Sequence, residues 1–245
     1  MKLPEVFLRM IRDEKGNCDH SKCVLIVGAG LSATNVRKDG KGLPDWHNLM
    51  REMIDDLKDS ARCLDSQLVT LEKWLKKGEY LKIAGNFKKL TRQDQFNEFM
   101  KEKLDPPDII KNSKIHKTLL KIKFKGIITT NFDTVFEHQK SGLKALIYPQ
   151  CLKDLGAFKK AKYFVKIHGC ISAPQDLILT KEDYESARKN KQYKDLLKSI
   201  FLQHTILTVG FSLKDPDFLY LIKDIRKIYK DAMSHNIFIN EGSRE

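Results

Sequence analysis

Several short runs of this chain are apolar at almost every position, and they are rich in β-branched residues. In chain order they read CVLIVG, KGIITT, KALIYP, KYFVKIHG, DLILT, TILTVGF and NIFIN. Unbroken apolar runs are typical of strands that are buried on both faces, which a parallel sheet covered by helices requires. The sequence therefore predicts an α/β fold with an open, mostly parallel sheet and helices on both faces.

A long stretch, from about residue 45 to residue 123, separates the first two of these runs. Its apolar residues keep helical spacing through WHNLMREMIDDLKD, QLVTLEKWLKK, EYLKIAGNFKKL and DQFNEFMKEKL. This is several times the length of a crossover helix, so it predicts an additional helical layer or lid inserted after the first strand. We expect Pro106 and Pro107 to mark its exit, and residues 1–245 to form a single domain.

Charge and cysteine content narrow the class of protein. The net charge of +13 comes mostly from scattered lysines, which are typical of solvated helix faces. The sequence has no cluster of arginines and aromatic residues of the kind that would indicate a nucleic-acid surface. The cysteines are odd in number and form no C-x-x-C pair, so neither a disulfide framework nor a zinc ribbon is expected. No run approaches the ~20 apolar residues that span a bilayer. These features predict a cytoplasmic protein with free thiols and no membrane contact.

Small residues follow the first strand in the spacing G-x-G-x-x-A, at Gly28, Gly30 and Ala33. Such a turn lets the backbone approach a pyrophosphate, whose charge free N–H groups and a helix N-terminus favour. The same spacing also fits a tight strand-to-helix turn without a ligand. No second strand that carries an acidic residue follows about 20 residues later, so the sequence lacks the usual pattern of dinucleotide-binding dehydrogenases.

Polar residues also follow two later strands. Asn131 and Asp133 come just after GIITT, and His168 closes KYFVKIHG. Open α/β sheets bind ligands at this strand edge, and an imidazole is a natural proton acceptor at neutral pH. Alternatively, Asn131 and Asp133 cap the next helix and His168 is structural. The other histidines have no comparable context and are interpreted as surface or satisfied core residues.

Two further helix starts are predicted from capping chemistry. Thr180 precedes Asp183 by three residues in TKED, as in a capping box. Asp215 and Pro216 in DPDF are typical of an N-cap followed by proline at the first helical position.

The motifs GAGLSA, GLPDW, TTNFD, KIHG, VGFS and FIN stand in this order along the chain. With these motifs at these separations, the sequence resembles the sirtuin family and its zinc-free NAD-hydrolase branch, as in bacterial antiphage defence proteins. The resemblance implies an open Rossmann-like sheet that binds NAD and breaks its bond between nicotinamide and ribose. It covers nearly the whole chain, although the helical insertion and the helices from residue 187 to 203 carry nothing specific.

The resemblance also implies roles for individual residues. Asn131 is expected to orient the reacting ribose or water, and His168 to act as the general base. Trp46 and His47 stand where sirtuin deacylases usually have phenylalanine and arginine, which changes the contacts of the cofactor loop but keeps an aromatic wall. The residues expected to bind NAD are Gly28, Ala29, Gly30, Ser32, Pro44, Asp45, Trp46, Asp133, Gly210, Ser212, Asn240 and Glu241.

The nucleophile decides which reaction such a site performs. Sirtuin deacylases carry a four-cysteine zinc module, whereas only Cys170 stands between His168 and the TILTVGF run here. The favoured prediction is an NAD+ hydrolase that uses water, needs no metal, and releases nicotinamide and ADP-ribose in a bacterial antiphage (abortive infection) system. Two alternatives stay open: an NAD-dependent protein deacylase, and a non-catalytic module that senses NAD or an ADP-ribose derivative.

Partners are expected from the resemblance as well. Such domains commonly form homo-oligomers and are coupled to a sensor that keeps them silent. This chain stops at NEGSRE soon after its last predicted strand, so we expect a sensor domain or partner protein outside it, and the chain to be a fragment. A nucleic-acid partner has weak support from the net charge, and competition by heparin tests it.

Overall fold

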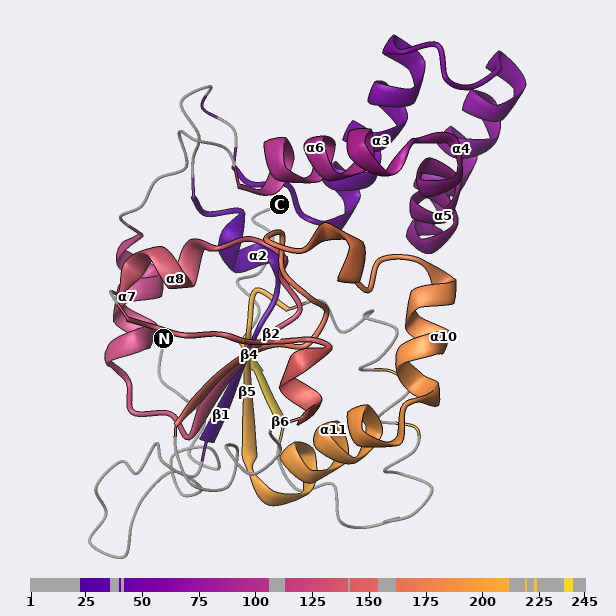
Figure 1. The fold of residues 1–245 in the computed structure, drawn as a ribbon. Helices are drawn as coiled ribbons and strands as arrows, with labels where there is room; N and C mark the ends of the chain where they lie inside the picture. Colours follow the sequence, from indigo (N-terminus) through magenta and orange to yellow (C-terminus); the bar gives the residue numbers. More distant parts are fainter. Residues whose placement is uncertain are drawn as a thin grey trace, which may run out of the picture.

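The computed structural model describes residues 23–35, 42–105, 113–140, 142–153, 162–211 and 236–239, with residues 40, 219 and 223. Within them a six-stranded sheet has the order β3-β4-β2-β1-β5-β6, and every neighbouring pair is parallel. The predicted α/β class with an open Rossmann-like sheet is confirmed (Figure 1). The strands are β1 (Cys23–Val27), β2 (Gly126–Thr129), β3 (Leu146–Ile147), β4 (Tyr163–Lys166), β5 (Thr205–Val209) and β6 (Asn236–Ile239).

The prediction of a strand in the run DLILT is wrong. Its apolar residues are buried, but the chain forms no strand there. The N–H of Ile178 donates to the carbonyl of His168 (2.9 Å), and the N–H groups of Leu179 and Thr180 donate to Oδ2 of Asp183 (3.2 and 2.9 Å). The amide groups that a sheet ladder would pair are thus taken by a turn and a helix cap.

The predicted capping box is present at the start of α10 (Lys181–Lys189). Oγ1 of Thr180 accepts from the N–H of Asp183 (3.2 Å), and the Asp183 carboxylate accepts from the N–H of Thr180. The other predicted helix start, at residues 215–216, and the predicted exit of the insertion, at residues 106–107, lie outside the described residues.

Helices cover both faces of the sheet because successive strand residues point to opposite sides. Val24 and Ile26 of β1 share one core with Tyr184 of α10 and with side chains of α11. Leu25 and Val27 share another core with α2, α7 and α8. Figure 1 shows the two groups on opposite sides of the strands. These helices are α2 (Ala29–Ser32), α7 (Lys114–Lys121), α8 (Val135–Gln139) and α11 (Lys191–Gln203).

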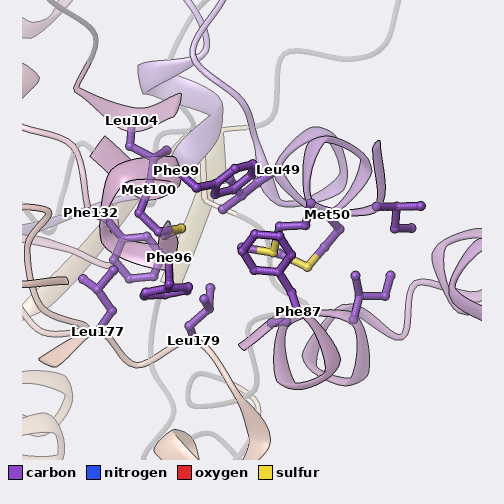
Figure 2. Packing of buried hydrophobic residues seen from close by; sticks show 14 of the residues in the cluster. Leu49, Met50, Phe87, Phe96, Phe99, Met100, Leu104, Phe132, Leu177 and Leu179 are labelled. Carbon is purple, nitrogen blue, oxygen red and sulfur yellow. The ribbon is translucent and has the colours of Figure 1, made fainter. Parts of the chain in front are cut away.

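Four helices follow α2 and lie beyond the carboxyl ends of the strands (Figure 1). They share an apolar core with the loop residues Phe132, Leu177 and Leu179, which Figure 2 shows beside α6. The rings of Phe87 and Phe99 pack inside this core with centroids 4.8 Å apart. The helices are α3 (Trp46–Asp59), α4 (Asp65–Lys77), α5 (Tyr80–Leu90) and α6 (Gln93–Leu104). The single domain and the lid role of residues 45–123 stay predictions.

Among the described residues, no helix has both the length and the apolar character needed to cross a bilayer.

Candidate active site

The carboxyl ends of four adjacent strands lie level with one another. Val27 of β1 pairs with Thr129 of β2 and with Val209 of β5, and Thr129 in turn pairs with Lys166 of β4. Because all four strands are parallel, the segments that follow them leave the sheet at the same edge. The predicted site residues in these segments are Gly28, Asn131, His168 and Gly210.

The glycines of the first turn approach the end of β5. The N–H of Gly28 donates to the carbonyl of Val209 (3.1 Å), and the N–H of Gly30 donates to the carbonyl of Gly210 (2.9 Å). A Cβ on Gly28 would lie 2.5 Å from the Gly210 carbonyl oxygen and from Cα of Phe211. We expected these amide groups to be open to a pyrophosphate, but both are used within the protein. At these two positions the absence of a side chain serves close backbone packing.

The side chain of Asn131 is held in one orientation. Its Nδ2 donates to the carbonyl of Gly28 (3.0 Å) and to Oγ of Ser32 (2.9 Å), and its backbone N–H donates to Oγ1 of Thr129 (3.0 Å). A carbonyl oxygen only accepts, so this network assigns the amide nitrogen to the Gly28 side. The Oδ1 of Asn131 is buried and has no hydrogen-bond partner in the described part of the chain. This acceptor can receive a hydrogen bond from a ligand hydroxyl or a water.

Ser32 connects α2 to this network. Its hydroxyl oxygen accepts from Asn131, so its own proton is available to another acceptor. The backbone carbonyl of Ser32 accepts from Nδ2 of Asn35 (3.0 Å), which holds the end of α2 in place. Ser32 is buried and Ala29, at the other end of α2, is half-buried.

Asp133 performs the capping role that was the alternative to cofactor binding. Its Oδ1 accepts from the N–H of Val135 (3.0 Å) at the start of α8. The residue is buried, and it lies two positions after Asn131. The binding of NAD+ by Asp133 stays a prediction.

His168 lies in the turn that directly follows β4. The N–H of the preceding residue, Ile167, donates to the carbonyl of Thr129 (3.0 Å), so pairing with β2 continues up to the histidine. The imidazole is fully buried, and its ring meets that of Tyr184 edge-on with centroids 5.2 Å apart. The backbone thus places His168 beside the strand end that leads to Asn131. Its role as general base stays a prediction.

The predicted cofactor loop leads into α3. Asp45 is the N-cap, because its Oδ1 accepts from the N–H of Asn48 (2.9 Å), and Pro44 before it is buried. The ring of Trp46 meets Phe132 edge-on, with centroids 6.4 Å apart. The predicted aromatic wall therefore contacts the residue that follows the candidate catalytic asparagine.

Three predicted NAD-binding residues, Ser212, Asn240 and Glu241, lie outside the described residues, so their roles stay predictions. Across the described ranges, no group of three or more histidine, cysteine, aspartate or glutamate residues could hold a metal ion. The expectation that the protein needs no zinc also stays a prediction.

Sequence reasoning missed Lys166, the last residue of β4. Its side chain is 0% exposed, and its Nζ donates to the carbonyls of Phe132 (3.3 Å) and Asp133 and pairs with Oε1 of Glu137 (3.1 Å). Burial opposes the charge, but Glu137, Cys170 and Asp133 outweigh it and raise the pKa of the ammonium group. The signal in the sequence was a lysine between apolar residues, in the stretch YFVKI.

His116 of α7 is fully buried beneath α8, and not all of its polar atoms are satisfied. Its Nδ1 lies 2.8 Å from Oγ of Ser113, and its ring meets Phe136 edge-on with centroids 4.6 Å apart. Its Nε2 has no hydrogen-bond partner among the residues described. Burial lowers the pKa of His116 to about 4, and the Asp133 carboxylate offsets part of this effect. The interpretation of this histidine as a satisfied core residue therefore holds for one ring nitrogen.

We expect His116 to make the protein acid-sensitive. The unfolded chain takes up a proton at His116 near pH 6.5, whereas the folded chain does so only near pH 4. The stabilisation is therefore complete above pH 6.5 and is lost as the pH falls toward 4, by up to ~3 kcal/mol. Denaturant unfolding of the wild type and of His116→Leu between pH 7 and pH 4.5 measures it. The exposed His138→Gln is the control, and equal slopes for wild type and His116→Leu would contradict the prediction.

Comparisons with known proteins agree with the motif resemblance. The family model described as SIR2-like domain matches residues 125–245, which begin just before β2. Defense-associated sirtuin 2 of Bacillus subtilis is 26% identical over 258 residues, covering 97% of this chain and 23% of that protein.

Two further relatives carry the name NAD(+) hydrolase ThsA. The protein from Bacillus cereus (strain MSX-D12) is 25% identical over 251 residues, covering 100% of this chain and 48% of its own length. The protein from Enterococcus faecium is 26% identical over 226 residues, covering 89% of this chain and 42% of its own length. The chain thus spans less than half the length of each of these curated relatives.

Proposed function

This chain is a sirtuin-like protein, and we propose that it hydrolyses NAD+ at the bond between nicotinamide and ribose. One observation carries the proposal: the buried Oδ1 of Asn131 is an acceptor without a partner among the described residues, at the carboxyl edge of the sheet, on an amide that Gly28 and Ser32 hold in place. The names of the NAD(+) hydrolase relatives support the same reaction.

The proposed reaction consumes one water. The bond from the ribose carbon to nicotinamide breaks, nicotinamide leaves as a neutral molecule, and positive charge develops on the ribose. The oxygen of water bonds to that carbon, and ADP-ribose and one proton result. Asn131 accepts a hydrogen bond from the water or from a ribose hydroxyl and so orients it, while His168 takes the proton.

The proposed biological role is depletion of NAD+ in a bacterial antiphage system. The name of the Bacillus subtilis relative, Defense-associated sirtuin 2, supports this role. A homo-oligomer, a sensor region or partner protein outside these residues, and a cytoplasmic location belong to the same proposal. Size-exclusion chromatography with light scattering measures the oligomeric state.

Chromatography of NAD+ incubated with the purified chain tests the proposal. We expect nicotinamide and ADP-ribose from the wild type and from Asn97→Ala, a control asparagine on α6. We expect neither product from Asn131→Ala or from His168→Ala.

Other results would select another function. Release of nicotinamide that depends on an added acyl-lysine peptide, with transfer of the acyl group to ADP-ribose, would identify a deacylase. NAD+ that binds with equal affinity to the wild type, Asn131→Ala and His168→Ala, without any product, would identify a sensing module.

A further inference from the structure

Lys166 is a charged residue at a buried position of the sheet, where an apolar side chain is usual. It is the final residue of β4, a strand in which every residue is buried, and its own side chain is 0% exposed. Removal of an ammonium group from water is costly unless the group is fully paired, and an apolar residue of similar size would serve packing as well. The amine therefore calls for an explanation beyond burial.

All three protons of the ammonium group have acceptors. Two acceptors are the backbone carbonyls of Phe132 and Asp133, and the third is the carboxylate of Glu137 on α8. Phe132 and Asp133 directly follow Asn131, where the chain has left β2 and has not yet entered α8. Lys166 thus supplies donors to two carbonyls of this loop, which belong to neither element.

The same contacts connect the two candidate catalytic segments. Lys166 is two residues before His168 in the chain, and its ammonium group binds the loop that carries Asn131. The carbonyl of Phe132 also accepts from the N–H of Ile171 (2.9 Å), in the turn that follows the histidine. The loop after β2 and the turn after β4 are therefore joined at one carbonyl by a side chain and by the backbone.

We propose that Lys166 is a positioning residue that fixes the Asn131 loop relative to His168, with Glu137 as its counterion. The reaction part of this inference rests on the proposed NAD+ hydrolysis. Lys166 itself does not touch the reacting atoms. The carboxylate of Glu137 balances its charge. Without this counterion, a buried cation near the site would oppose the positive charge that develops on the ribose.

A double substitution separates positioning from plain structural support. Lys166→Met leaves Glu137 without its cation, whereas Lys166→Met combined with Glu137→Leu removes both charges and should recover thermal stability. Neither form restores donors to the two carbonyls. We therefore expect both forms to lower kcat by about 10- to 100-fold, with KM for NAD+ changed less than about threefold.

Lys88→Met is the matched control. Lys88 of α5 pairs with Asp183 of α10 (3.5 Å) and is partly buried, but it contacts no residue of the Asn131 loop in the described structure. We expect its kcat to equal that of the wild type. A double variant with wild-type kcat would overturn the proposal, because stability alone would then explain the lysine.

Hydrogen exchange of the amides in residues 130–139 gives a readout that does not need activity. We expect exchange at least about tenfold faster in the double variant than in Lys88→Met or the wild type. Unchanged exchange would overturn the proposal. A wild type that releases no nicotinamide, together with faster exchange in the double variant, would reject NAD+ hydrolysis and keep the positioning role.

Discussion

Replacement of Asn131 by aspartate is expected to lower the rate of NAD+ cleavage by about a thousandfold, or about 4 kcal/mol of transition-state stabilisation. The substitution changes one group, since an oxygen takes the place of Nδ2. That nitrogen donates to the carbonyl of Gly28 at 3.0 Å, and a carboxylate oxygen there would face a carbonyl oxygen without a proton between them. The introduced carboxyl must then rotate or take up a proton, and either change moves the acceptor that faces the substrate. Nicotinamide release under saturating NAD+ measures the effect.

The control for this prediction is Asn97→Asp on α6, which makes the same chemical change away from the strand edge. Its rate should equal that of the wild type. Unfolding midpoints of both variants show whether the fold is retained. A folded Asn131→Asp that cleaves NAD+ at more than about a tenth of the wild-type rate would contradict the role of the fixed amide.

Gly210→Ala is expected to lower the free energy of unfolding by ~3 kcal/mol or more. Gly210 has φ +59°, and a Cβ there would lie 2.2 Å from the backbone nitrogen of Leu31. The nitrogen is a backbone atom and the position of a Cβ is fixed by its own backbone, so no change of rotamer can move them apart. Relief of the clash would separate the first turn from β5 and break the hydrogen bond from Gly30 to Gly210. Urea unfolding measures the loss.

Two other glycines separate the causes of this loss. Gly142 also has a positive φ, +75°, but a Cβ there would have no atom of the described residues within 4 Å, so Gly142→Ala should cost only ~1–2 kcal/mol. Gly85 lies inside α5, and a Cβ there would meet only Oε2 of Glu182, at 3.9 Å; Gly85→Ala should therefore stabilise by ~0.5–1 kcal/mol. Equal losses for Gly210→Ala and Gly142→Ala would show that the backbone angle, and not the close approach, makes Gly210 necessary.

Much of the fold follows from local sequence patterns. The apolar runs around Cys23–Val27 and Gly126–Thr129 predicted buried parallel strands, because two covered faces favour an apolar side chain at nearly every position. The capping box at Thr180 was equally readable, since its donor and acceptor lie three residues apart. The same logic failed at residues 177–179, where an apolar run is buried without sheet partners. The apolar composition of a segment predicts that it is buried, whereas its pairing into a sheet depends on whether the edge of another strand is free to bind it.

The residue types at the candidate site could also be predicted, because the sequence alone shows which predicted strands are followed by asparagine, aspartate or histidine. The orientation of the Asn131 side chain, however, depends on partners about a hundred residues away. The Asn131 amide is oriented by Gly28 and Ser32, which the register between β1 and β2 brings to it. Gly28 and Gly30 pack against Gly210, which their spacing alone could not show, and their binding of NAD+ stays a prediction.

Lys166 shows most clearly which features depend on the sequence alone and which depend on the tertiary structure. The sequence alone determined that β4 is a buried strand with one lysine in it. The neighbouring residues in the sequence do not indicate which groups pair with the charge of that lysine. Its acceptors, Phe132, Asp133 and Glu137, stand about thirty residues earlier and meet it because β2 and β4 are neighbours in the sheet. Local propensity and burial act over a few residues, so the sequence carries them directly. Hydrogen-bond geometry in the interior is decided by the register of strands that are distant in the chain, and it exists only once they have paired.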